Sequence, residues 1–307
     1  MPEVIVLGAG ISGLTVAHKL ARAGKDVVVL EEASRVGGKI VTNREEGYLL
    51  ESGPNSLRVE NQEMIDLIEE VGLTERIIDA NPTSKKRYVL KEGSWVQLPS
   101  GPKEAIVTPL LSIGGKLRTL LEPFISKTKL EDESAASFVR RRLGKEILDY
   151  AADPFITGIY AGDPEKLSMK HAVARMWRAE QEEGSLLKGL MKVRAEKGPA
   201  RIRPRVISFP EGLSELTNAL RDPLGEKLKL HAGALGIEPS PNGYRITSSG
   251  GSIEAQSIIF ALPANRVAPM IEPIAPELSK ILLGISYPPV AVAFLGYAEN
   301  QFAKVPE

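Results

Sequence analysis

The sequence of 307 residues contains no cysteine and only three histidines, and its formal net charge is zero. The lack of cysteine excludes disulfides, iron–sulfur clusters, thiol redox chemistry and cysteine-ligated zinc. The histidines, His18, His171 and His231, stand far apart, whereas metal ligands usually come in recognisable clusters. A neutral chain gives no electrostatic argument for binding nucleic acid. We therefore expect neither a metal centre nor a nucleic-acid partner.

Targeting and membrane-spanning signals are also scarce. The chain enters an apolar strand pattern at once, with Glu3 where a signal peptide would carry positive charge. One uncharged run, 281–297, is interrupted by Gly284 and the pair Pro288–Pro289, and it predicts a loop and a short buried strand over 290–294. The composition, 43% hydrophobic and 25% charged, is that of a globular protein of about two domains. We expect a cytoplasmic protein.

The clearest motif stands at the N-terminus. A β-branched run, Val4–Leu7, predicts a buried strand, a helical pattern follows over 12–23, and a second apolar run covers 26–30. Three glycines in the spacing G-x-G-x-x-G join the first strand to the helix, and an acidic residue ends the second strand. This order is typical of a Rossmann-like α/β dinucleotide-binding domain. The glycines are Gly8, Gly10 and Gly13.

The shape of a dinucleotide explains these glycines. Gly8 permits the tight turn from strand to helix, Gly10 lets a pyrophosphate approach the backbone, and Gly13 allows close packing of helix and strand. The start of the helix also offers backbone N–H groups, such as those of Ile11 and Ser12, and a positive dipole end to the phosphates.

Acidic residues and a second glycine pair narrow the choice of dinucleotide. Glu31 is spaced to accept a hydrogen bond from a ribose hydroxyl, and Glu32 follows it where an NADP site would need a basic residue. The next segment predicts another close backbone approach along the same ligand, which nicotinamide enzymes do not need there. It resembles the E-x(3)-R-x-G-G-[RK] extension of the flavin amine oxidase superfamily, and this resemblance implies FAD. The segment contains Arg35, Gly37, Gly38 and Lys39.

The rest of the chain predicts a polar turn, a hairpin and several helices. The turn closely follows the first motif, and we interpret it as a floor for a flavin ring. A hairpin is expected over 88–98, a helix over 134–151 and an exposed basic linker over 197–204. The amphipathic pattern of 106–124 suits core helices and helices on a membrane surface equally well. The polar turn consists of Gly53, Pro54, Asn55 and Ser56.

These patterns predict a discontinuous nucleotide domain, because strand patterns of the first kind return late in the chain. The expected boundaries are 1–80 and 206–276 for the FAD-binding domain, 81–205 for a mostly helical insertion, and 277–307 for the start of a substrate-binding sheet.

Several further stretches occur together in one family. They are K-R-Y at 86–88, L-E-P at 121–123, D-P-F-I-T-G-I-Y-A-G-D-P at 153–164, L-S-M at 167–169, and F-P-E-G-L at 209–213. With the polar turn, they resemble the oxygen-dependent protoporphyrinogen oxidases of haem synthesis across essentially the whole chain. The resemblance implies oxidation of a porphyrinogen by hydride transfer to the flavin, reoxidation by molecular oxygen, and formation of hydrogen peroxide.

The same resemblance assigns roles to three residues. Arg87 matches an arginine that pairs with a propionate. Gly158 matches a glycine whose backbone faces the macrocycle, and we expect it in a turn between two Asp-Pro pairs. Ala234 occupies the place where the backbone of a residue, more often valine in the family, contacts the adenine.

Family members are longer than this chain, so the resemblance also implies that a C-terminal third, which covers the flavin and walls the substrate pocket, is absent. We expect the chain to be inactive by itself. The partners implied are a porphyrinogen, molecular oxygen, a second copy in a homodimer, and the inner face of the cell membrane as a peripheral docking surface.

Three alternatives stay open. The substrate is protoporphyrinogen IX or coproporphyrinogen III, which differ by two propionates. The second alternative is an amine oxidase or carotenoid desaturase on the same flavin fold. The third is a flavoprotein without catalytic activity.

Overall fold

The protein is described from a computed structural model, which covers residues 1–82, 86–195, 202, 204–298 and 301. It divides into two compact units. The first comprises 1–80, 202–287 and 291–305, and the second comprises 81–201, 288–290 and 306–307. The predicted linker 197–204 lies outside the described residues except at 202 and 204.

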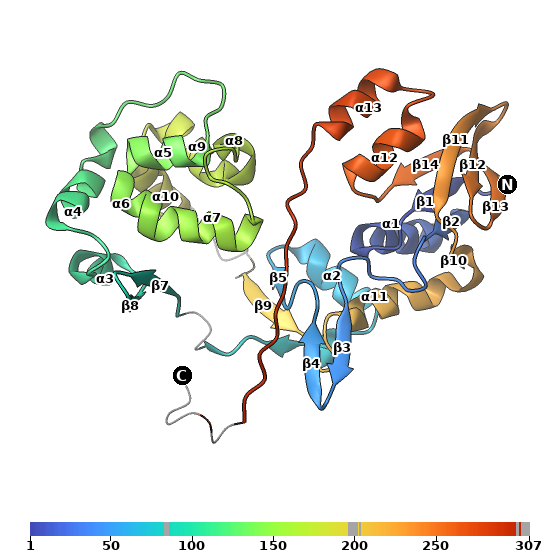
Figure 1. Cartoon of the computed structure of the whole chain (residues 1–307), viewed down its shortest axis with the longest axis horizontal. Coiled ribbons are helices and arrows are strands. Elements are labelled where there is room, and N and C mark those ends of the chain that lie inside the picture. Colours follow the sequence, from blue (N-terminus) through green and yellow to red (C-terminus); the bar gives the residue numbers. More distant parts are fainter. Residues whose placement is uncertain (83–85, 196–201, 203, 299–300, 302–307) are drawn as a thin grey trace. The chain divides into compact units, whose positions relative to one another are not determined.

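A four-stranded parallel sheet forms the centre of the first unit (Figure 1). Its order is β10-β2-β1-β14, so the two N-terminal strands lie between strands that come far later in the chain. Val4 pairs with Val27 on one side and with Ser257 on the other. The strands are β1 (Val4–Leu7), β2 (Val27–Leu30), β10 (Leu228–Lys229) and β14 (Ser257–Phe260).

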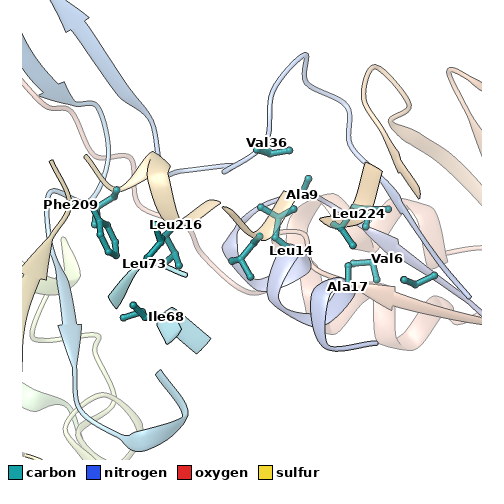
Figure 2. Packing of buried hydrophobic residues seen from close by; sticks show 14 of the residues in the cluster. Val6, Ala9, Leu14, Ala17, Val36, Ile68, Leu73, Phe209, Leu216 and Leu224 are labelled. Atoms are coloured by element: carbon teal, nitrogen blue, oxygen red, sulfur yellow. The ribbon is translucent and has the colours of Figure 1, made fainter. Parts of the chain in front are cut away.

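Both faces of this sheet are covered. Val6 packs with Leu14 and Ala17 of helix α1 (Ile11–Arg22) and with Leu220 of α11 (Ser214–Arg221) in one core cluster, part of which Figure 2 shows. Ile5 and Leu7 join a second cluster with residues of the antiparallel sheet β11-β12-β13. Successive side chains of a strand point to opposite faces, so burial on both faces explains the unbroken apolar run of β1. The antiparallel strands are β11 (Ala234–Ser240), β12 (Gly243–Ser248) and β13 (Gly251–Ala255).

Short strands and helices complete the first unit. Helix α2 begins after Asn61, whose side chain accepts a hydrogen bond from the backbone N–H of Met64 and so caps the helix. The remaining elements are β3 (Thr42–Glu45), β4 (Tyr48–Glu51), β5 (Leu57–Val59), α2 (Gln62–Glu70), η1 (Thr74–Arg76), β6 (Ile78–Asp79), β9 (Arg205–Ser208), η5 (Asp222–Lys227), α12 (Ala264–Ile271) and α13 (Pro276–Leu283).

The second unit is mostly helical, with one hairpin. Phe138 and Trp177 form the centre of its apolar cluster, with ring centroids 6.1 Å apart. The elements are β7 (Tyr88–Lys91), β8 (Ser94–Gln97), α3 (Pro102–Val107), α4 (Ile113–Leu120), η3 (Glu122–Phe124), α5 (Ala135–Arg142), α6 (Lys145–Ile147), the π-helical turn η4 (Leu148–Ala152), α7 (Asp153–Tyr160), α8 (Met169–Ala172), α9 (Ala174–Glu183) and α10 (Leu186–Ala195). No helix in the described part of the chain is both long and apolar enough to cross a bilayer.

A buried ion network ties the helices of this unit together. Arg142, fully buried, contacts Glu122 Oε1 at 2.9 Å and Glu180 Oε1 at 2.5 Å, and both carboxylates are fully buried too. Arg142 also donates to the backbone oxygen of Gly184 at 2.7 Å. Burial tends to raise the pKa of Glu180, but the guanidinium groups of Arg141 and Arg142 outweigh it, and the pKa lies below its usual value. Each charge is therefore compensated where it is buried.

Several sequence predictions need correction. The helix expected over 134–151 breaks at Gly144, whose φ is +93°, although Ser134 does cap its first part. The strand expected over 290–294 is wrong: these residues form no strand and are exposed, with Val290 71% accessible. Strand β3 begins at Thr42 as one arm of a hairpin with β4. The hairpin over 88–98 is confirmed.

We predict that Arg142→Met destabilises the protein by about 3–5 kcal/mol, because it leaves the buried carboxylate of Glu122 without its cation and removes one of the two arginines that pair with Glu180. Chemical denaturation followed by far-ultraviolet circular dichroism measures this. The matched control is Arg140→Met, whose half-exposed arginine pairs with Glu165 and should cost less than about 1 kcal/mol. Equal effects of the two substitutions would contradict the prediction.

Candidate functional site: a glycine-lined dinucleotide cleft

The first glycine loop lies where β1 ends and α1 begins. Gly10 is the N-cap residue of α1, and no side chain caps this helix. The first backbone N–H groups of α1 therefore have no capping side chain as acceptor. A helix start of this kind attracts phosphate through its N–H groups and dipole. Ile11 is half-buried and Ser12 is exposed at this position.

The three glycines are required for different reasons. Gly8 has φ of +101°, and a Cβ on it would lie 2.8 Å from the carbonyl oxygen of Ala261. A Cβ on Gly13 would lie 1.9 Å from the Gly8 carbonyl oxygen, so only glycine permits the observed approach of α1 to the loop. Gly10, in contrast, has an ordinary φ of −69°, and its Cβ would meet no protein atom within 4 Å. Neither strain nor packing of the chain explains glycine here, whereas a ligand in that space would.

Glu31 connects the first glycine loop to the segment that follows β2. Its carboxylate accepts hydrogen bonds from the backbone N–H of Ala9 at 2.7 Å and from that of Ala33 at 2.9 Å. Each carboxylate oxygen can accept more than one hydrogen bond, so these contacts leave capacity for a ribose hydroxyl. Glu31 thus fixes the glycine loop to the segment after β2 in addition to its predicted role.

The second glycine segment lies against the first. Gly37 forms a parallel bridge with Gly10, and its backbone N–H donates to the Ala9 carbonyl oxygen at 2.8 Å. A Cβ on Gly38, whose φ is +59°, would lie 3.1 Å from the Gly10 Cα. Arg35 donates to the backbone oxygens of Val36 and Gly38, each at 3.1 Å, and so folds over its own loop. The structure brings the two predicted glycine segments together.

A pocket of about 370 Å³ opens beside the first loop, at the carboxyl ends of β1 and β2. Glu31, Glu32 and Ala234 all line it, so the structure places the residue predicted to contact adenine in one cavity with the acid predicted to contact ribose. Its remaining lining is largely apolar, as a purine requires. The other lining residues are Leu7, Gly8, Leu30, Gly233, Leu235, Ser249, Leu262, Arg266, Pro269 and Met270.

Sequence reasoning missed Arg266. This residue comes from α12, and its guanidinium lies 3.6 Å from the carboxylate of Glu32. The absence of a basic residue next to Glu31 in sequence therefore does not mean that the pocket lacks a cation. No sequence signal identified Arg266, because only the fold carries α12 to this pocket.

The polar turn adjoins the second glycine segment. A Cβ on Gly53 would lie 1.9 Å from the Lys39 carbonyl oxygen, so this backbone contact again requires glycine. Ser56 donates to the side-chain oxygen of Asn55 at 3.1 Å, and both residues are exposed, as is Pro54. Their predicted role toward a flavin ring stays a prediction.

The two predicted substrate residues belong to the second unit. Arg87 is exposed and precedes β7, where its backbone oxygen accepts from Leu98 N–H at 2.8 Å. Gly158 does not lie in a turn, as predicted, but in helix α7, because the Asp-Pro pair at 153–154 starts a helix instead of a loop. Its φ is not positive, and a Cβ there would meet nothing within 4 Å.

Fold and cleft together define a dinucleotide-binding flavoprotein architecture. The sequence profile described as flavin containing amine oxidoreductase matches residues 11–305, and the chain belongs to this family. FAD is its cofactor, and the glycine loops and the pocket fit an extended dinucleotide: the space beside Gly10 is open, Gly38 lies close against Gly10, and no side chain caps α1.

Named relatives are similar over nearly the whole chain. Protoporphyrinogen oxidase 1 of Arabidopsis thaliana is 34% identical over 97% of this chain and 59% of its own length. Coproporphyrinogen III oxidase of Bacillus subtilis is 29% identical over 97% of this chain and 67% of its own length. A crystal structure of a provisionally assigned protoporphyrinogen oxidase from Exiguobacterium sp. 255-15 superposes with a TM-score of 0.71, at 27% identity, over 90% of this chain and 63% of that one. The chain thus spans about 60% of the length of the curated plant relative.

We predict that Gly10→Ala weakens FAD binding at least about tenfold, or about 1.4 kcal/mol, because its Cβ would occupy space that the pyrophosphate needs. The thermal midpoint of the apoprotein should change little, since that Cβ meets no protein atom. Flavin fluorescence titration and thermal unfolding measure the two effects.

The matched control is Gly101→Ala. Gly101 is also a helix N-cap glycine with open space around its Cβ, but it precedes α3 in the second unit. If Gly101→Ala weakened FAD binding as much as Gly10→Ala does, the argument from open space would be wrong.

Proposed function

We propose that this chain carries the cofactor-binding part of an FAD-dependent porphyrinogen oxidase of haem biosynthesis. The observation that supports it most is the similarity to protoporphyrinogen oxidases over 97% of the chain, on a fold with the required glycine cleft. Protoporphyrinogen IX is the proposed substrate, molecular oxygen the proposed electron acceptor, and hydrogen peroxide the proposed by-product.

In this proposal the first unit holds the cofactor. The two glycine segments and the start of α1 bind the pyrophosphate, Glu31 accepts from the ribose, and the pocket around Ala234 takes the adenine. Bound FAD supplies the redox chemistry by accepting hydride and passing electrons to oxygen. The residues proposed to hold it are Gly8, Gly10, Ile11, Ser12, Gly13, Glu31, Glu32, Arg35, Gly37, Gly38, Lys39, Gly53, Pro54, Asn55, Ser56 and Ala234.

The second unit supplies the substrate contacts. A porphyrinogen is a large, mostly apolar ring with ionised propionates, so it needs an apolar surface and a fixed cation. Arg87 offers a planar guanidinium that can donate two parallel hydrogen bonds to a carboxylate. Gly158 lies on an exposed part of α7 whose neighbours Phe155 and Ile159 are 43% and 57% accessible. The missing side chain of Gly158 would let a flat ring approach the helix closely.

Coproporphyrinogen III is the second candidate substrate. It is favoured by the similarity to the Bacillus subtilis coproporphyrinogen III oxidase over 97% of this chain. Incubating protein extended to the length of its relatives with each porphyrinogen, and recording porphyrin fluorescence, separates the two candidates. If neither porphyrinogen is oxidised by the flavin-loaded protein, the proposed function is wrong.

We predict that, in such an extended protein, Arg87→Ala raises KM for the porphyrinogen about tenfold or more, or about 1.4 kcal/mol, because a charge-assisted pair is lost. Gly158→Val should lower kcat/KM by crowding the ring, and it should not harm the helix, since valine is a better helix former than glycine. Flavin content should stay unchanged in both.

The control for these variants is Arg175→Ala, which removes another exposed arginine of the second unit. If Arg87→Ala and Gly158→Val oxidise porphyrinogen like the parent, or if both lose flavin, neither residue lines the substrate site.

We further propose a peripheral membrane contact for the second unit. Helices α3 and α4 and the turn η3 expose large apolar side chains, with lysines and arginines nearby in sequence, as interfacial helices do. The exposed residues are Ile106 (71%), Val107 (76%), Ile113 (80%), Leu117 (56%), Leu120 (67%) and Phe124 (83%). The homodimer stays a prediction.

We predict that the protein co-sediments with vesicles that contain anionic phospholipid, and that Ile113→Ser combined with Phe124→Ser reduces the bound fraction at least about threefold, because it removes exposed apolar area that the membrane would bury. The control is Leu235→Ser, which removes an exposed leucine of the first unit. Equal binding of all three proteins would contradict the membrane contact.

A further inference from the structure

One motif has no role in the function proposed above: the F-P-E-G-L stretch at 209–213. It forms the turn between β9 and α11, closed by the Gly212 N–H, which donates to the Phe209 carbonyl oxygen at 2.9 Å. Phe209 is buried in the core of the first unit, and Gly212 has φ of +83°. The turn therefore has a fixed backbone, and the backbone N–H groups of the buried Leu213 and half-buried Ser214 are held in a defined direction.

A backbone N–H of this turn donates a hydrogen bond to a buried carboxylate. Glu51, the last residue of β4, is only 7% accessible. Its Oε1 accepts from the backbone N–H of Leu213 at 2.7 Å, and its Oε2 accepts from the hydroxyl of Thr42 at 2.8 Å. In the described part of the chain Glu51 has no ion pair with a lysine or arginine, so these hydrogen bonds compensate its burial.

Thr42 and Ser214 exchange a pair of hydrogen bonds beside Glu51. The Thr42 backbone N–H donates to the Ser214 hydroxyl at 3.0 Å, and the Ser214 backbone N–H donates to the Thr42 hydroxyl at 3.1 Å. Gly212 fits closely against both partners, since a Cβ on it would lie 2.4 Å from Thr42 Cγ2 and 2.5 Å from Glu51 Oε1. We call Thr42, Glu51, Gly212, Leu213 and Ser214 the clasp.

The clasp lies between two segments that are proposed to contact FAD: the second glycine segment at the pyrophosphate and the polar turn at the flavin ring. Thr42 follows the second glycine segment, and Glu51 precedes the polar turn. The Ser52 N–H donates to the Val41 carbonyl oxygen at 2.8 Å, and Gly53 approaches the Lys39 carbonyl oxygen too closely for a Cβ. A shift of Thr42 or Glu51 would thus move both segments together.

We propose that Glu51 is a positioning residue for the pyrophosphate and flavin of FAD: through the clasp it fixes the second glycine segment and the polar turn to the start of α11. This inference rests on the proposed binding of FAD across the first unit, but not on any porphyrinogen. The adenosine pocket is lined by none of the clasp residues, so its affinity for adenosine should be independent of the clasp.

The experiment compares two ligands on the apoprotein of the full chain. FAD reports the whole cleft, whereas adenosine, which has no phosphate, reports only the adenosine end. We expect Glu51→Ala to weaken FAD binding tenfold or more, to leave adenosine affinity within twofold of the parent, and to shift the visible circular dichroism of bound flavin. Glu51→Gln keeps one acceptor and should fall between the parent and Glu51→Ala. The matched control is Glu60→Gln, at an exposed acid of the same unit, with parental binding of both ligands.

Thr42→Val provides an independent test if Glu51→Ala does not fold, because it removes only the hydroxyl that joins Glu51 to Ser214. It should weaken FAD more than adenosine. An equal loss of FAD and adenosine affinity, or a lower thermal midpoint with parental FAD affinity and flavin spectrum, would overturn the proposal. A parent that binds FAD but oxidises no porphyrinogen would refute the proposed function and leave this comparison intact.

Discussion

The close approach of helix α1 to the loop before it is the contact on which the first unit depends. A Cβ on Gly13 would lie 1.9 Å from the Gly8 carbonyl oxygen, so no other residue fits without moving the helix. Through this approach the uncapped N-terminus of α1 is held next to the carboxyl end of β1. It also leaves room for the Gly37 segment to bridge Gly10. The same loop also meets the second glycine segment and, through the Ala9 N–H, the carboxylate of Glu31, so this one backbone contact lies at the junction of every part of the cleft.

The sequence predicted the parts of the fold that are governed by local patterns. The first strand, helix and second strand follow from apolar period and glycine spacing, and they lie within one or two residues of their predicted ends. The parallel sheet and the α/β class were predicted as well. The meeting of Ala234 with Glu31 in one pocket was expected only through resemblance, because no pattern in the chain links positions so far apart.

Other features could not be predicted because they depend on tertiary contacts. Arg266 reaches the adenosine pocket only because α12 follows β14 back to the sheet. Glu51 looks like an ordinary acid at the end of a short strand, and only the fold shows that it is buried against Leu213. Gly158 was misplaced because Asp-Pro and glycine signal turns as readily as helix starts. The apolar stretch 290–294 has the composition of a buried strand, but in the described structure it has no partner strand.

The order of strands in the central sheet has a consequence for synthesis on the ribosome. Strand β1 emerges early, but its neighbour β14 begins at Ser257, so more than two hundred residues must be made before β1 is flanked on both sides. At roughly 5–20 residues per second, this takes on the order of ten to fifty seconds. During that time the apolar run Val4–Leu7 has an unpaired edge, which is a template for wrong pairing. Most of the second unit lies within 81–201, so this part of the chain is synthesised while one edge of β1 is still unpaired.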